Sequence, residues 1–166
     1  MKKYLKFAGA VAFVFALVAF ILLMATPGAY SNGILGDYNY PGTLVIFGGE
    51  LNHAKYDLAW TGLISWILVL VAMLILCAGV VLPLLKVKAL EKFAGVLNLV
   101  AVIALLAAGV LTFFSGLAFG GAQGAEGDNL KYWHLGAGWV VAGILALIGG
   151  VVAVLPAVVD FLGKKK

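Results

Sequence analysis

Charge is what this sequence most conspicuously lacks. Only 11% of its 166 residues are charged, none is arginine, and 64% are hydrophobic. A water-soluble domain usually has about a quarter of its residues charged, so this composition excludes an ordinary soluble domain. Long uncharged apolar runs instead place the chain among integral membrane proteins.

Cysteine and the common motifs of catalysis are scarce as well. The single cysteine, Cys77, can form neither an internal disulfide nor a Cys-x-x-Cys redox pair. The sequence has no glycine-rich phosphate loop, no Gly-x-Ser-x-Gly and no His-Glu-x-x-His. It has no nucleic-acid-binding motif either. We therefore expect neither an enzyme nor a nucleic-acid-binding protein.

Four apolar stretches are long enough to cross a membrane. A hydrocarbon core of about 30 Å needs about 20 apolar residues in a helix. Backbone polar groups find no water there, so these stretches must be helical. None of them contains Asp, Glu, Lys or Arg. The predicted helices cover residues 7–25, 58–85, 93–114 and 133–159 of a single domain, 1–166.

The first stretch also resembles a secretory signal peptide, because it follows Met1-Lys2-Lys3. Its apolar run is longer than such signals usually have, and no small-x-small cleavage site follows it. These two features favour a helix that stays in the protein.

The placement of lysines predicts the orientation of the helices. Nine of the eleven lysines flank the predicted helices on one side: before the first, in the loop 86–92, and after the fourth. Only Lys55 and Lys131 lie on the other side. By the positive-inside rule, both termini are cytoplasmic and residues 26–57 and 115–131 form outer loops. The lysine-only basic set and the short loops favour a bacterial plasma membrane.

The tryptophans indicate an aromatic belt and a possible duplication. All four lie toward the outer ends of the second and fourth helices, as in an aromatic belt at a membrane interface. Trp60 and Trp133 are each followed six residues later by a second tryptophan, and later by a Leu-Pro pair. Two related helix pairs would explain this recurrence, and so would shared interfacial preferences alone.

Small residues at a spacing of four predict how the helices pack. Helices in lipid associate through close contact of small side chains. The third and fourth helices carry such stripes: Ala104, Ala108, Thr112, Gly116, Gly138, Ala142, Ala146 and Gly150. The stripes serve packing within the bundle or docking onto another protein. Asn98, a polar residue of the third helix, is expected to bond between helices, with a transport site as the alternative.

The first outer loop combines turn signals with β-forming residues. Tyr38-Asn39-Tyr40 and the run 43–47 flank Pro41-Gly42, which predicts a hairpin centred on that pair. A lone hairpin is marginally stable, so it must pack on the helices or on a partner. The expected contact residues are Tyr38, Tyr40, Leu44, Ile46 and Phe47. A lid that binds nothing is the alternative. The glycine-rich second loop is expected to be a flexible connector.

The two histidines, His53 and His134, both lie on the predicted outer side. Their spacing matches no metal motif, and two histidines at the rim do not favour a haem inside the bundle. We therefore expect no metal and no cofactor.

The layout resembles that of claudin-type tetraspan proteins, which have four spans and a long first outer loop with strand signals. In that family the loop carries a tryptophan, a Gly-Leu-Trp and two cysteines. Here Trp60-Thr61-Gly62-Leu63 is a loose counterpart at the start of a helix, and the loop has no cysteine. The resemblance is one of layout, and no functional residue is carried over.

Together these patterns predict an all-α membrane protein, a four-helix bundle with a small extracellular hairpin-like loop. The expected function is that of a non-catalytic accessory subunit or scaffold. It would contact another membrane protein or a second copy through the first outer loop and a small-residue helix face. A small oligomeric transporter or channel component is the alternative, although proton-coupled transport usually needs an ionisable residue within the membrane.

Overall fold

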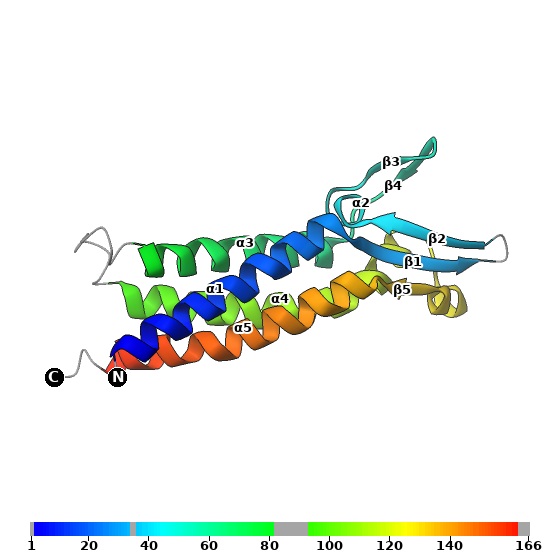
Figure 1. Cartoon of the computed structure of the whole chain (residues 1–166). Coiled ribbons are helices and arrows are strands. Elements are labelled where there is room, and N and C mark those ends of the chain that lie inside the picture. Colours follow the sequence, from blue (N-terminus) through cyan, green and yellow to red (C-terminus); the bar gives the residue numbers. More distant parts are fainter. Residues whose placement is uncertain (1, 34–35, 82–92, 163–166) are drawn as a thin grey trace.

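The computed structural model describes residues 2–33, 36–81 and 93–162. Its main feature is a bundle of four long helices (Figure 1): α1 (Lys2–Ala25), α3 (Trp60–Val81), α4 (Ala94–Ala122) and α5 (Ala137–Leu162). Each is long and apolar enough to cross a membrane, so the prediction of a four-span integral membrane protein is confirmed. α1 begins and α5 ends at the same end of the bundle, here named the terminal end. Strands lie at the opposite end, the sheet end.

The bundle is a closed ring in which each long helix contacts the next one in the chain. α3 packs on α1 and α4, and α5 closes the ring by packing on α4 and α1. The interior face of α1 consists of alanines, and Ala12, Ala16 and Ala19 are completely buried. Large apolar side chains such as Leu74 and Ile103 point outward instead. A soluble protein could not carry so extensive an exposed apolar surface, whereas lipid accommodates it.

A small antiparallel sheet stands beyond the ends of α1, α3 and α5 (Figure 1). Its strands are β1 (Pro27–Gly33), β2 (Gly36–Pro41) and β5 (Trp133–Leu135), in the order β2-β1-β5. A second hairpin pairs β3 (Gly49–Leu51) with β4 (Ala54–Tyr56). The predicted small sheet in the first loop is therefore confirmed, and it also recruits a strand from the second loop.

The hairpin is not centred where the sequence predicted. Gly33 pairs with Gly36, so the turn of this hairpin does not lie at Pro41-Gly42. Residues 34–35 lie outside the described residues. The run after Pro41 forms a short helix, α2 (Gly42–Phe47), where a strand was expected. A short apolar run does not distinguish a strand from a buried helix. Leu44, Val45 and Ile46 are all buried, a pattern that a one-sided strand could not produce.

α4 is longer than the predicted span 93–114. Its last turns continue past residue 114 and pack on β5. Gly116 allows this, since a Cβ there would lie 2.8 Å from the backbone nitrogen of Leu135. The second loop is thus not a flexible connector: residues 115–122 are helical, Gly127–Tyr132 is a 3-10 helix, and β5 follows. α5 accordingly begins at Ala137 and not at Trp133.

Trp139 joins the sheet to the bundle. Its side chain is completely buried, and its Nε1–H donates a hydrogen bond of 3.1 Å to the carbonyl oxygen of Leu23. That carbonyl lacks its normal helical partner, because the residue four positions later is Pro27, which has no N–H. Gly28 and Gly42 admit the indole, since a Cβ on either would lie 2.9 to 3.0 Å from it.

This position corrects two interpretations of the tryptophans. Trp139 belongs to the core and not to an aromatic belt, whereas Trp60 is 69% exposed. The first tryptophans of the two recurring pairs also lie in different elements. Trp60 is the first residue of α3, whereas Trp133 lies in β5. The tryptophan recurrence therefore does not reflect structurally equivalent positions. Of the matched prolines, Pro156 lies inside α5 and Pro83 lies outside the described residues.

Candidate interaction surface at the sheet end

The sheet end has an aromatic core of its own. Tyr40 of β2 lies at the centre, with ring-centroid distances of 5.3 Å to Tyr56, 5.3 Å to Phe119 and 5.2 Å to Trp133. These partners come from β4, α4 and β5, so the four rings join two strands of one sheet, the second hairpin and a long helix. Edge-to-face and offset ring contacts of this kind add to the stabilisation from burial alone. The sheet end is therefore a built module and not a loose loop.

Burial also changes the acidity of one of these rings. It raises the pKa of the Tyr56 phenol above its ordinary value of 10.0, because the charged phenolate would lose hydration. The neighbouring Tyr40 adds to the increase through charge repulsion and a side-chain hydrogen bond. Tyr40 itself lies 3.3 Å from the hydroxyl oxygen of Ser31 on the adjacent strand. The cluster thus favours the neutral phenol of Tyr56.

The five predicted contact residues divide between core and surface. Tyr40, Leu44 and Ile46 are buried and belong to the core of the sheet end. Tyr38 is 50% exposed and Phe47 is 48% exposed. Only the latter two can touch another molecule without rearrangement. The sequence alone could not distinguish the exposed from the buried contact residues, because each of the five lies next to, or two positions from, another apolar or aromatic residue.

Phe47 differs from Tyr38 in its surroundings. Its ring contacts Trp66 at 5.2 Å, and Trp66 contacts Phe20 at 5.8 Å, so the three rings form a row along α1 and α3. α2 therefore lies over the junction of these helices at the end of the apolar spans.

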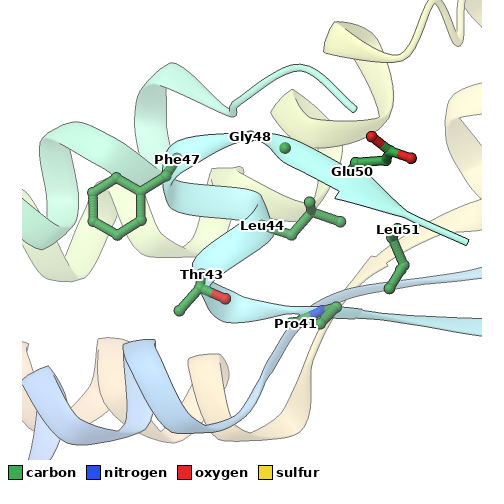
Figure 2. A pocket seen from close by; sticks show the side chains of 8 residues that line it. Pro41, Thr43, Leu44, Phe47, Gly48, Glu50 and Leu51 are labelled. Atoms are coloured by element: carbon green, nitrogen blue, oxygen red, sulfur yellow. The ribbon is translucent and has the colours of Figure 1, made fainter. Parts of the chain in front are cut away.

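A hollow opens between α2 and β3, with a volume of about 360 Å³. Figure 2 shows Leu44, Phe47 and Leu51 around it, with the carboxylate of Glu50 on β3 and the hydroxyl of Thr43 on α2. Its lining combines apolar side chains with one carboxylate and one hydroxyl. One carboxylate and one hydroxyl do not make a general acid–base pair, so the lining gives no support to catalysis.

The β3–β4 hairpin projects beside this hollow (Figure 1). Its turn residues Asn52 and His53 both have positive φ, 51° and 66°, as in the type I′ turn that suits tight hairpins. Asn and His are both among the non-glycine residues that adopt this conformation more often than most. The His53 side chain is fully exposed and its Nδ1 lies 3.9 Å from Glu50. The hairpin thus presents a polar, exposed tip.

The second histidine occupies a different place. His134 lies on β5 opposite Tyr30, and their rings stack at 4.9 Å. The two histidines therefore belong to different sheets. Among the described residues, no three His, Cys, Asp or Glu side chains are grouped so that they could hold a metal ion.

The small-residue stripes face the interior of the bundle. Ala104, Ala108, Thr112 and Gly116 are buried on α4. On α5, Ala142, Ala146 and Gly150 are buried, and Gly138 is half-buried against Thr26. A Cβ on Gly150 would lie 2.8 Å from Leu106 of α4, so the two helices approach closely there. The chain itself covers these faces, which leaves the sheet end as the candidate contact surface.

Polar contacts inside the bundle are few and specific. The hydroxyls of Ser65 and Thr112 contact each other, and both lie within 2.9 Å of the carbonyl oxygen of Ala108. The two hydroxyl groups share their two protons among these three contacts. The resulting hydrogen-bond network joins α3 to α4. Asn98 faces α3 near the terminal end, where a Cβ on Gly79 would lie 3.7 Å from its Oδ1. The sequence analysis singled out Asn98 and Thr112, but the contact of Thr112 with Ser65 could not be predicted from the sequence.

Comparison with known proteins assigns no family. A scan of protein-family models found no match to this chain, and a search of curated proteins found none either. The similarity to claudin-type proteins therefore consists of the layout alone: four long apolar helices with a small sheet between the first two.

Proposed function

We propose that this membrane protein is a non-catalytic accessory subunit or scaffold that contacts a partner protein through its sheet end. One observation carries the proposal: the sheet end is an ordered module, packed around an aromatic cluster, that stands beyond the bundle and exposes Tyr38 and the β3–β4 hairpin. Ordered aromatic and polar surfaces of this kind are typical of protein–protein contacts.

The composition of the spans supports the same proposal. The apolar windows of the four helices contain no Asp, Glu, Lys or Arg. Their inward faces are filled with alanine, glycine and hydroxyl-bearing residues that pack against one another. A proton-coupled transporter usually keeps an ionisable group within the membrane. The helices therefore suit a structural role better than a transport cycle.

The lysine distribution gives the proposed orientation. Nine lysines belong to the terminal end in the sequence order of the helices, and two belong to the sheet end. The positive-inside rule then places the sheet end outside the cytoplasm, where it would meet the exposed part of another membrane protein.

Site-specific photo-crosslinking in native membranes tests the proposal. A photoreactive amino acid replaces Tyr38 or His53 at the sheet end, and Ile103 on the lipid-facing side of α4 serves as the matched control. We expect discrete crosslinked proteins from both sheet-end positions and none from position 103. Crosslinks that arise only from position 103, or from no position, would contradict a partner at the sheet end.

A further inference from the structure

The strand β2 is an open edge of the three-stranded sheet. It pairs with β1 on one side and, among residues 2–33, 36–81 and 93–162, with no strand on the other. The opposite edge of the sheet, β5, is covered by α4, against which Gly116 and Gly120 bring it into close contact. In the described part of the chain, no hydrogen bond from outside the sheet reaches the backbone of residues 36–40. Such an edge is a template for a further strand.

The register identifies the backbone groups that face this open edge. Gly136 N–H donates to the Gly28 carbonyl at 3.0 Å, so Gly28 and Tyr30 direct their backbone groups toward β5. The alternate residues of β1, among them Ser31, must then face β2 and bond to its residue Tyr38. Asp37 and Asn39 lie between the bonded positions of β2. Their N–H and C=O groups therefore point away from the sheet.

The direction of β2 restricts the strand that can join it. β1 leaves the end of α1 and runs away from the bundle, and β2 returns toward it (Figure 1). A strand antiparallel to β2 must therefore run away from the bundle, as β1 does. A chain that has just left the same end of a transmembrane helix has this direction.

Charge restricts the occupant further. The segments that form the sheet end, residues 26–59 and 123–136, contain five acidic residues and two lysines. A second copy of this chain would bring the same excess of negative charge and be repelled. A segment that contains lysine or arginine would be attracted.

We propose that β2 receives, as an additional antiparallel strand, an extended basic segment that directly follows a transmembrane helix of another membrane protein. This rests on the proposed function, since it specifies the partner and the contact. Main-chain hydrogen bonds at Asp37 and Asn39 supply the affinity, as in other cases of strand addition. The exposed Tyr38 side chain, on the strand between them, is placed to contact the added segment.

Peptide binding to the purified full-length protein tests this edge. The probe is an eight-residue peptide that alternates valine and lysine, and the control peptide alternates valine and glutamate. Asn39→Pro removes an outward N–H without removing a bond to β1, and Asn39→Ala is the matched variant that keeps it. We expect saturable binding by the wild type and Asn39→Ala, and about tenfold weaker binding by Asn39→Pro. The glutamate peptide should bind more weakly than the lysine peptide.

Hydrogen exchange on the unsubstituted protein provides a readout that needs no variant. The amides of Asp37 and Asn39 should exchange rapidly in the free protein and slow down when the lysine peptide binds. Protection that appears elsewhere, for example only on the β3–β4 hairpin, would overturn the edge proposal. Equal binding by Asn39→Pro and Asn39→Ala would do the same. Crosslinks from positions 38 and 53 would still support the proposed function in that case, so the two failures are distinguishable.

Discussion

At the scale of single residues, Trp139 shows how one side chain supplies a missing hydrogen bond to the backbone of a helix that is distant in the sequence. Pro27 leaves the Leu23 carbonyl without an amide donor at the end of α1, and the indole N–H of Trp139 supplies it. An unbonded buried carbonyl would cost about 1–3 kcal/mol. Trp66 presents the contrasting case, because its Nε1 is buried and has no hydrogen-bond partner among the described residues.

The same substitution at these two tryptophans should therefore have unequal effects. Trp139→Phe loses the bond to Leu23 and part of the contact with the surrounding glycines, so it should lower the free energy of unfolding by about 2–4 kcal/mol. Trp66→Phe removes an unsatisfied N–H together with some ring contact, and should cost less than about 1.5 kcal/mol. Denaturant unfolding in detergent measures both. A Trp66→Phe variant that is the less stable of the two would refute this account of Trp139.

Tyr56 should make the sheet end sensitive to alkali. Burial raises its pKa in the folded protein, so the unfolded chain loses this proton at a lower pH than the folded one. The stabilisation is complete below the unfolded pKa of about 10 and is lost as the pH rises through the folded pKa. Tyr56→Phe should therefore lose less stability than the wild type between about pH 9 and pH 11. Thermal unfolding across this range tests it, with Tyr132→Phe as the exposed control. Equal alkaline losses in wild type and Tyr56→Phe would count against the prediction.

At the scale of elements, the last turns of α4 explain why the second loop is ordered. Gly120 lies against the indole of Trp133, and a Cβ there would be 2.5 Å from its Cγ. The next residue, Gly121, has no atom within 4 Å of the same position. The two glycines are adjacent in α4, but only Gly120 has a neighbouring side chain where a Cβ would lie.

This contrast gives a matched pair of variants. Gly121→Ala should stabilise the protein by about 0.5–1 kcal/mol, because alanine favours a helix more than glycine does. Gly120→Ala makes the same local gain but pushes Trp133 out of the aromatic cluster, and should destabilise by about 1–3 kcal/mol. Unfolding measurements and the near-ultraviolet signal of the cluster report both effects. The idea fails if the two variants change stability in the same direction and to the same extent.

The elements also show what could be predicted from the sequence. The four long helices were predictable because hydrocarbon forces an uncharged run of that length to be helical. α2 and β5 were not, since their conformations depend on distant partners: Val45 is buried in the sheet-end core, and Trp133 pairs with Ser31 on β1. The sequence indicated the candidate contact residues, but which of them are exposed could not be predicted, because burial also depends on distant partners. Tyr38 and Tyr40 look alike in the sequence and lie on the same face of β2, because they are two residues apart. Only the contacts of Tyr40 with Tyr56, Phe119 and Trp133 place it in the core.

At the scale of the whole molecule, the lysine distribution predicts which end meets the cytoplasm. Cys77→Ser removes the single native cysteine, so that any maleimide labelling comes from the introduced cysteine. Asn52→Cys at the tip of the β3–β4 hairpin should react with a membrane-impermeant maleimide on intact cells. Lys165→Cys should react only after the membrane is permeabilised. Labelling of position 165 alone in intact cells would reverse the proposed orientation, and labelling of both positions would contradict it.

The bond between Trp139 and Leu23 has a consequence for biosynthesis. These residues are 116 positions apart, and β1 likewise finds its second neighbouring strand only in β5. A ribosome therefore inserts the first span and releases its hairpin well before the groups that complete them have been translated. Until β5 and the fourth span have been translated, the carbonyl of Leu23 lacks its donor from Trp139, and β1 and β2 each have an unpaired edge. Chains truncated before that span should consequently be recognised as unfinished and degraded by membrane proteases.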